Sequence, residues 1–273
     1  MMQRVKDSFL SFSLLVLIFT FGFRACALAQ NGPVSRGPGQ PPPGPSSPQN
    51  VPLNLFQDSG PTSSQVLLIS PGVLEIGGVR IVGKKRQIEI PCEVALSRGL
   101  LEYLLVGRSG KAYESLLCTK VQPVSIQLAL LLLGLKGTEQ PLSRQGDPAK
   151  PHGDPVIILV RWEQDGQVKT DRIEKWVMLV AGGGSRVMPP GAPKLHGTIM
   201  ELTNWIFTGS MFGLNGAFMA QVEKSIVAIY HDPVAQIDNP LAQGGSNRVW
   251  FVNEGKTPPV GTKVTVIVKK AGE

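Results

Sequence analysis

The stretch PVSIQLALLLLGLKG, residues 123–137, is the one long helix pattern in a chain that otherwise shows short strand patterns. Pro123 suits the first turn of a helix, and a glycine near the end of the stretch can terminate it. The stretch is apolar nearly all round, which is typical of a helix buried in a protein core. Its apolar run is too short to span a bilayer, which needs roughly 17–25 residues. We therefore expect one long buried helix from Pro123 to about Leu135.

Short apolar runs broken by glycine or proline lie on both sides of this helix. VLEIGGVRIV, residues 73–82, predicts two short strands joined by a glycine pair. RQIEIPCEVAL, residues 86–96, predicts a half-buried strand, with Pro91 marking an edge or a bulge. Residues 100–119 and 155–173 each predict a β-hairpin with a glycine-containing turn. The pattern indicates an α+β domain over residues 66–273, with a mainly antiparallel β-sheet and one long buried helix.

The N-terminal residues 1–29 have the three parts of a cleaved secretory signal peptide. Arg4 and Lys6 are positive, an apolar stretch of 15 residues runs from Phe9 to Phe23, and the small-x-small pattern ALA follows at residues 27–29. The expected mature chain begins at Gln30 and is secreted or periplasmic. An uncleaved membrane anchor and a lipid-modified Cys26 are the alternatives, although Arg24 fits the lipoprotein pattern poorly.

Residues 30–65 differ in composition from everything that follows. Nine prolines and five glycines fall between residues 31 and 65, and Arg36 and Asp58 are the only charges there. Such a segment cannot bury enough apolar surface to offset its ordering entropy. We expect a disordered Pro/Gly-rich linker, partly in the extended polyproline II conformation.

The charge and the cysteine count limit the classes of partner and cofactor. The formal net charge is +7, of which two charges belong to residues 1–29. The remaining excess is mild and lacks the long basic stripe of a nucleic-acid surface, so we expect no nucleic-acid partner. Only Cys92 and Cys118 remain after cleavage, which excludes a cysteine-ligated iron–sulfur cluster within one chain and makes a structural zinc site improbable. A disulfide between them and two buried thiols are both open, and no cofactor is expected.

The densest polar cluster is YHDPVAQIDNP, residues 230–240, which follows the apolar run SIVAIY. His231 with Asp232 or Asp238 could bind a metal or act as a general base, and Asn239 could support the site. Asp-Pro and Asn-Pro are also turn formers, so these residues can equally be a scaffold for the chain.

Glu102 and Glu114 lie on the two arms of the first predicted hairpin. Paired carboxylates can serve acid–base chemistry. A two-residue turn would place them on opposite faces, whereas a bulged three-residue turn would place them on the same face. The sequence leaves a paired site and an ordinary polar edge both open.

Several separated motifs resemble the YdjY-like family of exported bacterial proteins. They are LEYLLVGRSGKAYESLL, QLALLLLGL, WIFTGS, SIVAIYHDP, IDNPL and VWFVN, in this order between roughly Leu74 and Lys269. Some members are described as ferredoxin-like because they carry an added cysteine-rich segment, which this sequence lacks. The resemblance implies export and brings no catalytic residues.

Two functional hypotheses follow from these residues. The first is a non-catalytic exported domain that binds a small ligand or a cell-envelope partner. The alternative is a metal-dependent or general acid–base hydrolase that uses His231, Asp232 and Asp238. Convergence of these side chains in one pocket would favour the enzyme, whereas side chains bonded to their own backbone would favour the binding module.

Overall fold

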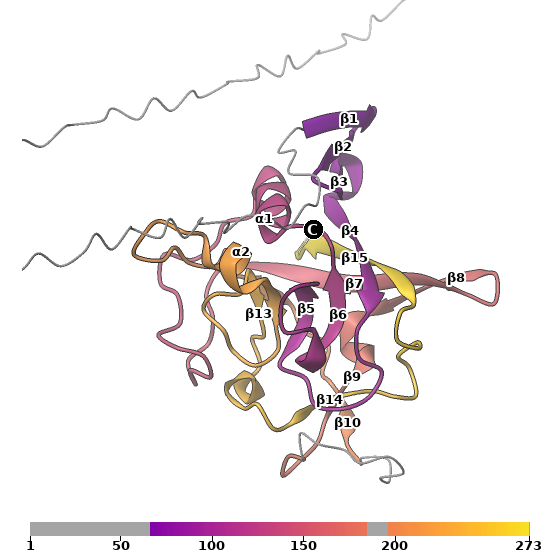
Figure 1. Ribbon diagram of the computed structural model, residues 1–273, viewed down its shortest axis with the longest axis vertical. Coiled ribbons are helices and arrows are strands. Elements are labelled where there is room, and N and C mark those ends of the chain that lie inside the picture. Colours follow the sequence, from indigo (N-terminus) through magenta and orange to yellow (C-terminus); the bar gives the residue numbers. More distant parts are fainter. Residues whose placement is uncertain (1–65, 185–195, 273) are drawn as a thin grey trace, which may run out of the picture. The chain divides into compact units, whose positions relative to one another are not determined.

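The computed structural model describes residues 66–184 and 196–272, and the predicted signal peptide and linker lie outside these residues. The described chain is mostly β, and eight of its strands close into a mixed β-barrel (Figure 1). The strands in their order around the ring are β4 (Gln87–Val94), β15 (Lys263–Lys270), β7 (Asp154–Gln164), β11 (Trp205–Phe207), β13 (Ile237–Asp238), β12 (Ser225–Ala228), β5 (Tyr103–Gly107) and β6 (Ser115–Thr119). The ring closes because β6, at the end of this path, pairs with β4.

The remaining strands extend the barrel or form a separate small sheet. From β4 the sheet continues outward through β3 (Val79–Val82) and β2 (Val73–Ile76) to the outermost β1 (Val66–Ser70). The long ribbon of β7 continues beyond the barrel with β8 (Gln167–Arg172). A separate small sheet has the order β10 (Thr198–Ile199), β9 (Val177–Leu179) and β14 (Trp250–Val252).

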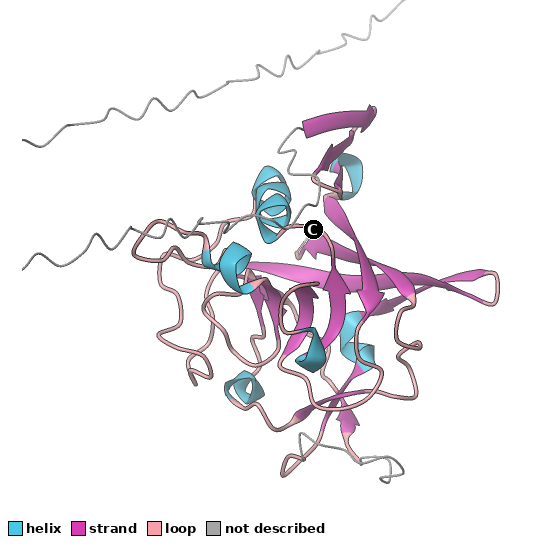
Figure 2. Ribbon diagram, viewed as in Figure 1, coloured by secondary structure: helices cyan, strands magenta, loops and turns pink. Residues whose placement is uncertain are grey.

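The helices are short. The described residues hold the α-helices α1 (Pro123–Leu132) and α2 (Met219–Glu223), and the 3₁₀-helices η1 (Gly83–Lys85), η2 (Ala112–Glu114), η3 (Ile173–Trp176) and η4 (Ala242–Gly245) (Figure 2). Helix α1 contacts β2, β3 and β4. Within this part of the chain, no helix is long and apolar enough to cross a membrane.

The predicted fold class is wrong. Instead of a mainly antiparallel sheet with one long buried helix, the chain forms a closed barrel with both pairing directions, because β12–β13 and β5–β6 are parallel. The predicted helix ends at Leu132 and has ten residues. Ile126, Ala129 and Leu130 are buried, but the opposite face of the helix is exposed. Nearly uniform apolar character therefore does not mean burial on all sides here.

The first predicted hairpin is also wrong. β5 and β6 pair in parallel, with Tyr103 opposite Ser115 and Gly107 opposite Thr119. Parallel neighbours ordinarily need a crossover of about a dozen residues or more. Here the chain first makes a turn, in which the Gly110 N–H donates to the Gly107 carbonyl. The 3₁₀-helix η2 follows and returns the chain to the start of β5. The glycines thus make a turn, but the chain reverses a second time before β6 begins.

The core joins the barrel to the strands and helix that flank it. Its largest fully buried side chains are mainly aromatic and β-branched residues, which pack well in sheets. They include Trp176, Trp205, Trp250, Tyr103, Phe207, Phe251, Ile88 and Ile90. The barrel wall is therefore rigid enough to hold side chains of neighbouring strands at defined positions.

Candidate functional site

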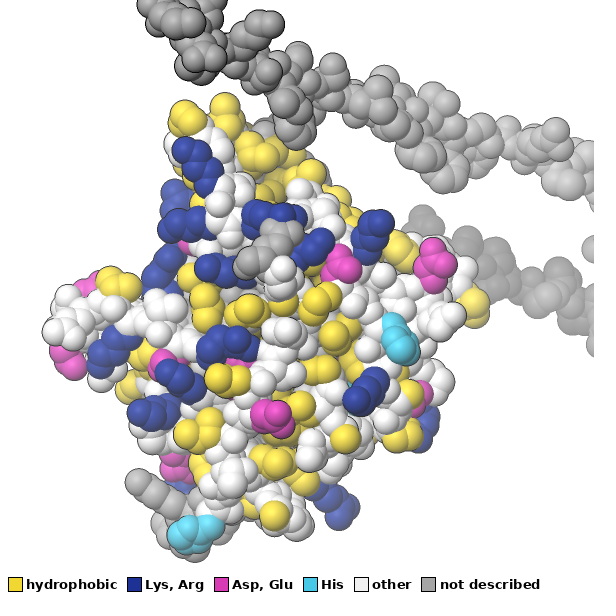
Figure 3. Space-filling view, turned by 180° about the vertical axis from the view of Figure 1, so that it is seen from behind, with side chains coloured by type: hydrophobic (Ala, Val, Ile, Leu, Met, Phe, Trp, Pro, Cys, Tyr) yellow, Lys and Arg dark blue, Asp and Glu magenta, His cyan; other side chains and the backbone are white. Residues whose placement is uncertain are grey.

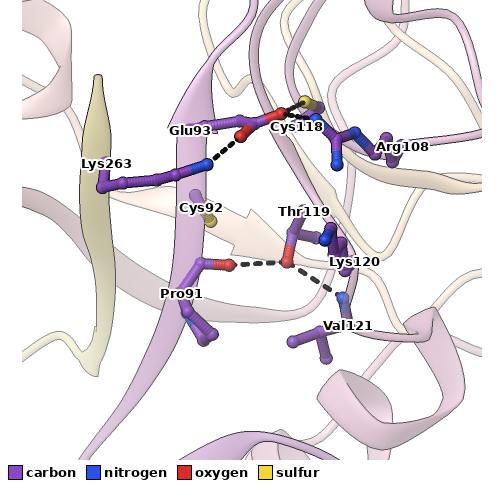
Figure 4. A pocket seen from close by; sticks show the side chains of 9 residues that line it. All are labelled: Pro91, Cys92, Glu93, Arg108, Cys118, Thr119, Lys120, Val121 and Lys263. Atoms are coloured by element: carbon purple, nitrogen blue, oxygen red, sulfur yellow. Dashed lines mark hydrogen bonds and ion pairs between the residues drawn. The ribbon is translucent and has the colours of Figure 1, made fainter. Parts of the chain in front are cut away.

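Strand β4 changes partner midway, and an opening forms at that place. Its first residues pair with β3, the last of them Glu89 opposite Arg80, and its last residues pair with β6, beginning with Glu93 opposite Cys118. Pro91 lies between the two pairings and has no N–H to donate, so it leaves no unpaired donor there. A cavity of about 210 Å³ opens beside it (Figure 4). The Pro91 cavity, as we call it, is lined by Pro91, Cys92, Glu93, Arg108, Cys118, Thr119, Lys120, Val121 and Lys263.

Three cations and one carboxylate line the Pro91 cavity. Glu93 forms ion pairs with Arg108, which follows β5, and with Lys263, which begins β15. Lys120, just after β6, is exposed at the same opening. Figure 4 shows the two partners of Glu93 reaching it from opposite sides. The lining therefore carries an excess of two positive charges, beside apolar carbon and sulfur atoms.

The wall of the cavity is held by a hydroxyl and the backbone. Thr119 donates its Oγ1 hydrogen to the Pro91 carbonyl at 2.7 Å, and the same oxygen accepts from the Val121 N–H at 3.1 Å. These bonds join β6 to β4 where the strands no longer form a ladder. The opening thus has a fixed rim even though the regular pairing stops.

The two cysteines of the cavity are buried and free. Neighbouring residues of a strand point to opposite faces, so Cys92 points away from Glu93, whereas Cys118 lies directly across from Glu93. Burial raises the pKa of both thiols, and the Glu93 carboxylate 3.7 Å from the Cys118 sulfur raises the pKa of that thiol further. Thiolate is the nucleophilic form, so these groups are poor nucleophiles at neutral pH.

Glu93 is held in its ionised form. The hydrogen bond from Lys263 and the charge of Arg108 lower the pKa of Glu93, and they outweigh the effect of burial. An ionised Glu93 is the counter-ion of two cations, Arg108 and Lys263, and an incoming anion would compete with it for both. From the sequence only Cys92, Cys118 and Pro91 of this site stand out, because the charged residues come from four separate segments. The available signal was Pro91 inside an otherwise regular strand pattern.

His231 lies elsewhere and is sealed inside the protein. Only 1% of its surface is exposed, and Gly244 packs so closely on the ring that a Cβ there would lie 2.1 Å from Nε2. Nδ1 is 2.6 Å from the carbonyl of Asp147, and Nε2 is 2.8 Å from the carbonyl of Asn239. Both ring nitrogens face carbonyl oxygens in a closed interior, so neither is accessible to a metal ion or to a substrate.

The other members of the predicted cluster bond to nearby backbone. The Asp238 carboxylate accepts from the N–H groups of Asp232, at 3.1 Å, and Asn239, at 2.7 Å. The Asn239 side chain donates to the Ile229 carbonyl at 2.9 Å and accepts from the Leu241 N–H at 3.0 Å. The structure does bring the cluster together, but as a network that shapes the turn after β12.

Asp232 connects this network to the barrel wall. Its Oδ2 accepts from the Tyr103 hydroxyl at 2.7 Å, and Lys111 donates to the same hydroxyl at 3.0 Å. Burial, and then the charge of Asp232, raises the pKa of Tyr103. A phenol that is buried and bonded in this way is a structural donor at neutral pH. Among the described residues, no group of three or more His, Cys, Asp or Glu side chains could hold a metal ion.

Glu102 and Glu114 are brought together through their backbones. Each immediately precedes a strand, and the Glu102 N–H donates to the Glu114 carbonyl at 2.9 Å. Both side chains are buried. In a hairpin, the length of the turn would decide whether the two side chains share one face of the sheet. This rule does not apply here, because β5 and β6 are parallel.

The buried carboxyl of Asp238 predicts a pH dependence of stability. Burial raises the pKa of Asp238 to about 8, although two backbone N–H groups lower it. The unfolded chain loses this proton near pH 3.9, so the free energy of unfolding falls between about pH 4 and 8. We expect the urea midpoint to be higher near pH 5 than near pH 8, and Asp238→Asn to reduce this difference. Asp165→Asn, in the exposed turn of the β7–β8 hairpin, should leave the difference unchanged; an equal difference in Asp238→Asn would contradict the assignment.

One comparison with known proteins gives a match. The model of the YdjY domain matches residues 79–269, which is well over half of the chain. No curated protein and no solved structure is significantly similar to the chain.

Proposed function

The chain belongs to the YdjY domain family, and we propose that its domain is an exported, non-catalytic module that binds a small organic anion in the Pro91 cavity. The observation that carries this proposal is the excess of two positive charges around a cavity whose inner surface is largely apolar. A fitting ligand has one negatively charged group and a short apolar body. Ligand sites commonly combine an apolar lining with a few placed polar groups.

The arrangement of Glu93 supports reversible binding. Its carboxylate occupies the positions on Arg108 and Lys263 that a ligand carboxylate or phosphate would take. Guanidinium and ammonium groups suit such oxyanions, and Arg can bind them through two parallel hydrogen bonds. The ligand anion would replace the Glu93 carboxylate on both cations, so neither Arg108 nor Lys263 would be left unpaired.

The engaged nitrogens of His231 weigh against the alternative hydrolase. A general base needs a free lone pair within reach of a substrate, and a metal ligand needs the same. Both ring nitrogens of His231, Nδ1 and Nε2, face carbonyl oxygens in the closed interior of the protein. The raised pKa of the Cys118 thiol likewise weighs against nucleophilic catalysis at the cavity.

Calorimetric titration with hexanoate and with inorganic phosphate tests the anion site. Arg108→Gln should weaken binding by about tenfold, because one charge-assisted hydrogen bond is lost. Glu93→Gln should strengthen it by a similar factor, because the competing carboxylate is removed while the side chain keeps its shape. Lys256→Gln, an exposed lysine that does not line the cavity, is the matched control and should bind as the wild type does. Equal affinities in all four proteins, or no binding in any, would contradict the proposal.

Export is the second part of the proposal and rests on residues 1–29. The positive residues, the apolar stretch and the ALA pattern at residues 27–29 support cleavage before Gln30. Mass spectrometry of the protein recovered from outside the cytoplasm should give an N-terminus at Gln30. A product that retains Met1 would contradict cleavage.

A further inference from the structure

Strand β1 exposes large apolar side chains on both of its faces. Val66, Leu67, Leu68 and Ile69 are between 44% and 71% exposed. Successive side chains of a strand alternate between its two faces, so within the described residues neither face of β1 is covered. In the described part of the chain β1 has β2 as its single neighbour, and its other edge is open. Exposed apolar edge strands are a liability that proteins normally cover or interrupt with charges.

Helix α1 adds a second exposed apolar surface near the same end of the molecule. Its buried stripe faces the strands β2, β3 and β4. The residues on its other side are Val124, Leu128, Leu131 and Leu132, which are 38–57% exposed. A surface helix normally carries polar side chains on this face. We call these four residues together with β1 the apolar tip; Figure 1 shows α1 beside the projecting strands β1 to β3.

Basic residues surround the apolar tip. Residues 66–86 contain four cations, Arg80, Lys84, Lys85 and Arg86, against the single acid Glu75. Lys120 and Lys136 flank α1, and residues 120–136 contain no acid. Figure 3 shows apolar side chains gathered at this end, with Lys and Arg side chains directly below them. These two segments therefore carry an excess of five positive charges beside the exposed apolar groups, and Glu89 of β4, which lies opposite Arg80 and close to Lys85, lowers this excess by one.

We propose that the apolar tip and its basic residues form a docking surface for a membrane that contains anionic lipids. Side chains such as Leu68 and Leu131 would enter the boundary between headgroups and acyl chains, and Lys84 and Lys85 would contact lipid phosphates. This charge complementarity favours a lipid surface over a second copy of the chain, because two copies would bring like charges together. The apolar groups form no single groove for a peptide, whereas a fluid interface can accommodate side chains from both faces of β1. Lys120 belongs to both surfaces, but β1, Lys84 and Lys85 do not line the Pro91 cavity, so variants of these residues test the docking surface separately from the anion site.

Co-sedimentation of the expected mature chain, which begins at Gln30, with lipid vesicles tests the docking surface. Vesicles of phosphatidylcholine mixed with phosphatidylglycerol should bind the protein at least about tenfold more tightly than phosphatidylcholine alone, and added salt should weaken the binding. The pair Leu68→Ser and Leu131→Ser should reduce binding about tenfold, as should Lys84→Glu with Lys85→Glu. These side chains are exposed, so the melting temperature should stay within a few degrees of the wild type.

Matched controls lie on a distant part of the molecule. Val168, in β8, is 70% exposed, so Val168→Ser removes an equally exposed apolar side chain, and Lys256→Glu reverses an exposed charge. Both variants should bind vesicles as the wild type does. Failure of the wild type to bind anionic vesicles, or an equal loss in the controls, would overturn the proposal. Sedimentation equilibrium provides a further check, since a dimer that Leu68→Ser dissociates, without vesicle binding, would assign the surface to a second copy.

Discussion

Leu130→Asp is expected to destabilise the domain by about 5 kcal/mol and to leave little folded protein. Leu130 is completely buried in the main core, on the side of α1 that packs against the sheet. The substitution removes an apolar side chain and places a carboxylate in the apolar core cluster. Urea unfolding followed by tryptophan fluorescence measures the effect, because Trp176, Trp205 and Trp250 are buried in the same core.

The adjacent residue offers a matched control for Leu130→Asp. Leu131 has the same side chain in the same helix but is 47% exposed. Leu131→Asp should therefore change the free energy of unfolding by no more than about 0.5 kcal/mol. Similar losses in the two variants would contradict the assignment of one buried and one exposed face to α1. A wild-type urea midpoint in Leu130→Asp would contradict the burial itself.

His231→Ala is expected to destabilise the domain by about 3 kcal/mol. The ring joins three segments, because its nitrogens face the carbonyls of Asp147 and Asn239 and Gly244 packs against it. Alanine would remove the ring N–H that one of these carbonyls accepts, which costs about 1–3 kcal/mol, and would leave a cavity beside Gly244. The measurement is again the urea midpoint, with Asn239→Ala as a second variant that should lose stability for the same reason.

His152→Ala is the control for this experiment, since His152 is exposed and should tolerate the change. Hexanoate and phosphate binding, measured on the fraction of His231→Ala that remains folded, should match the wild type. Normal stability together with lost binding would reverse the interpretation and return the cluster to the role of a site.

Local features of the fold could be predicted well from neighbouring residues. Gly77 and Gly78 both have positive φ and join β2 to β3, as the glycine pair indicated. Asp165 and Gly166 also have positive φ, and they form the tight turn of the β7–β8 hairpin. Turns of this kind depend on two residues whose backbone tolerates that conformation. The neighbouring sequence is therefore sufficient to specify them.

Features that depend on distant partners could not be predicted in this way. The glycines between residues 107 and 110 do form a turn, yet whether β6 then runs parallel or antiparallel to β5 depends on how β6 pairs with β4. The sequence predicts an edge or a bulge at Pro91, because it does not show which strands lie on either side; the structure shows a change of partner there. The sequence likewise does not show which face of α1 is exposed, since leucines occupy both faces of the helix.

The sequence by itself determined the local elements, the turns, the resemblance to the YdjY-like family and the residues that can carry charge. The tertiary structure alone decided the closure of the barrel and the meeting of Glu93, Arg108 and Lys263 around one cavity. It also decided that His231 is sealed while the apolar tip is exposed. The physical reason is the separation in sequence between the residues that interact. Turns and strand patterns arise from residues a few positions apart. A closed barrel depends on pairings such as Val264 with Trp162, which no short stretch of chain encodes.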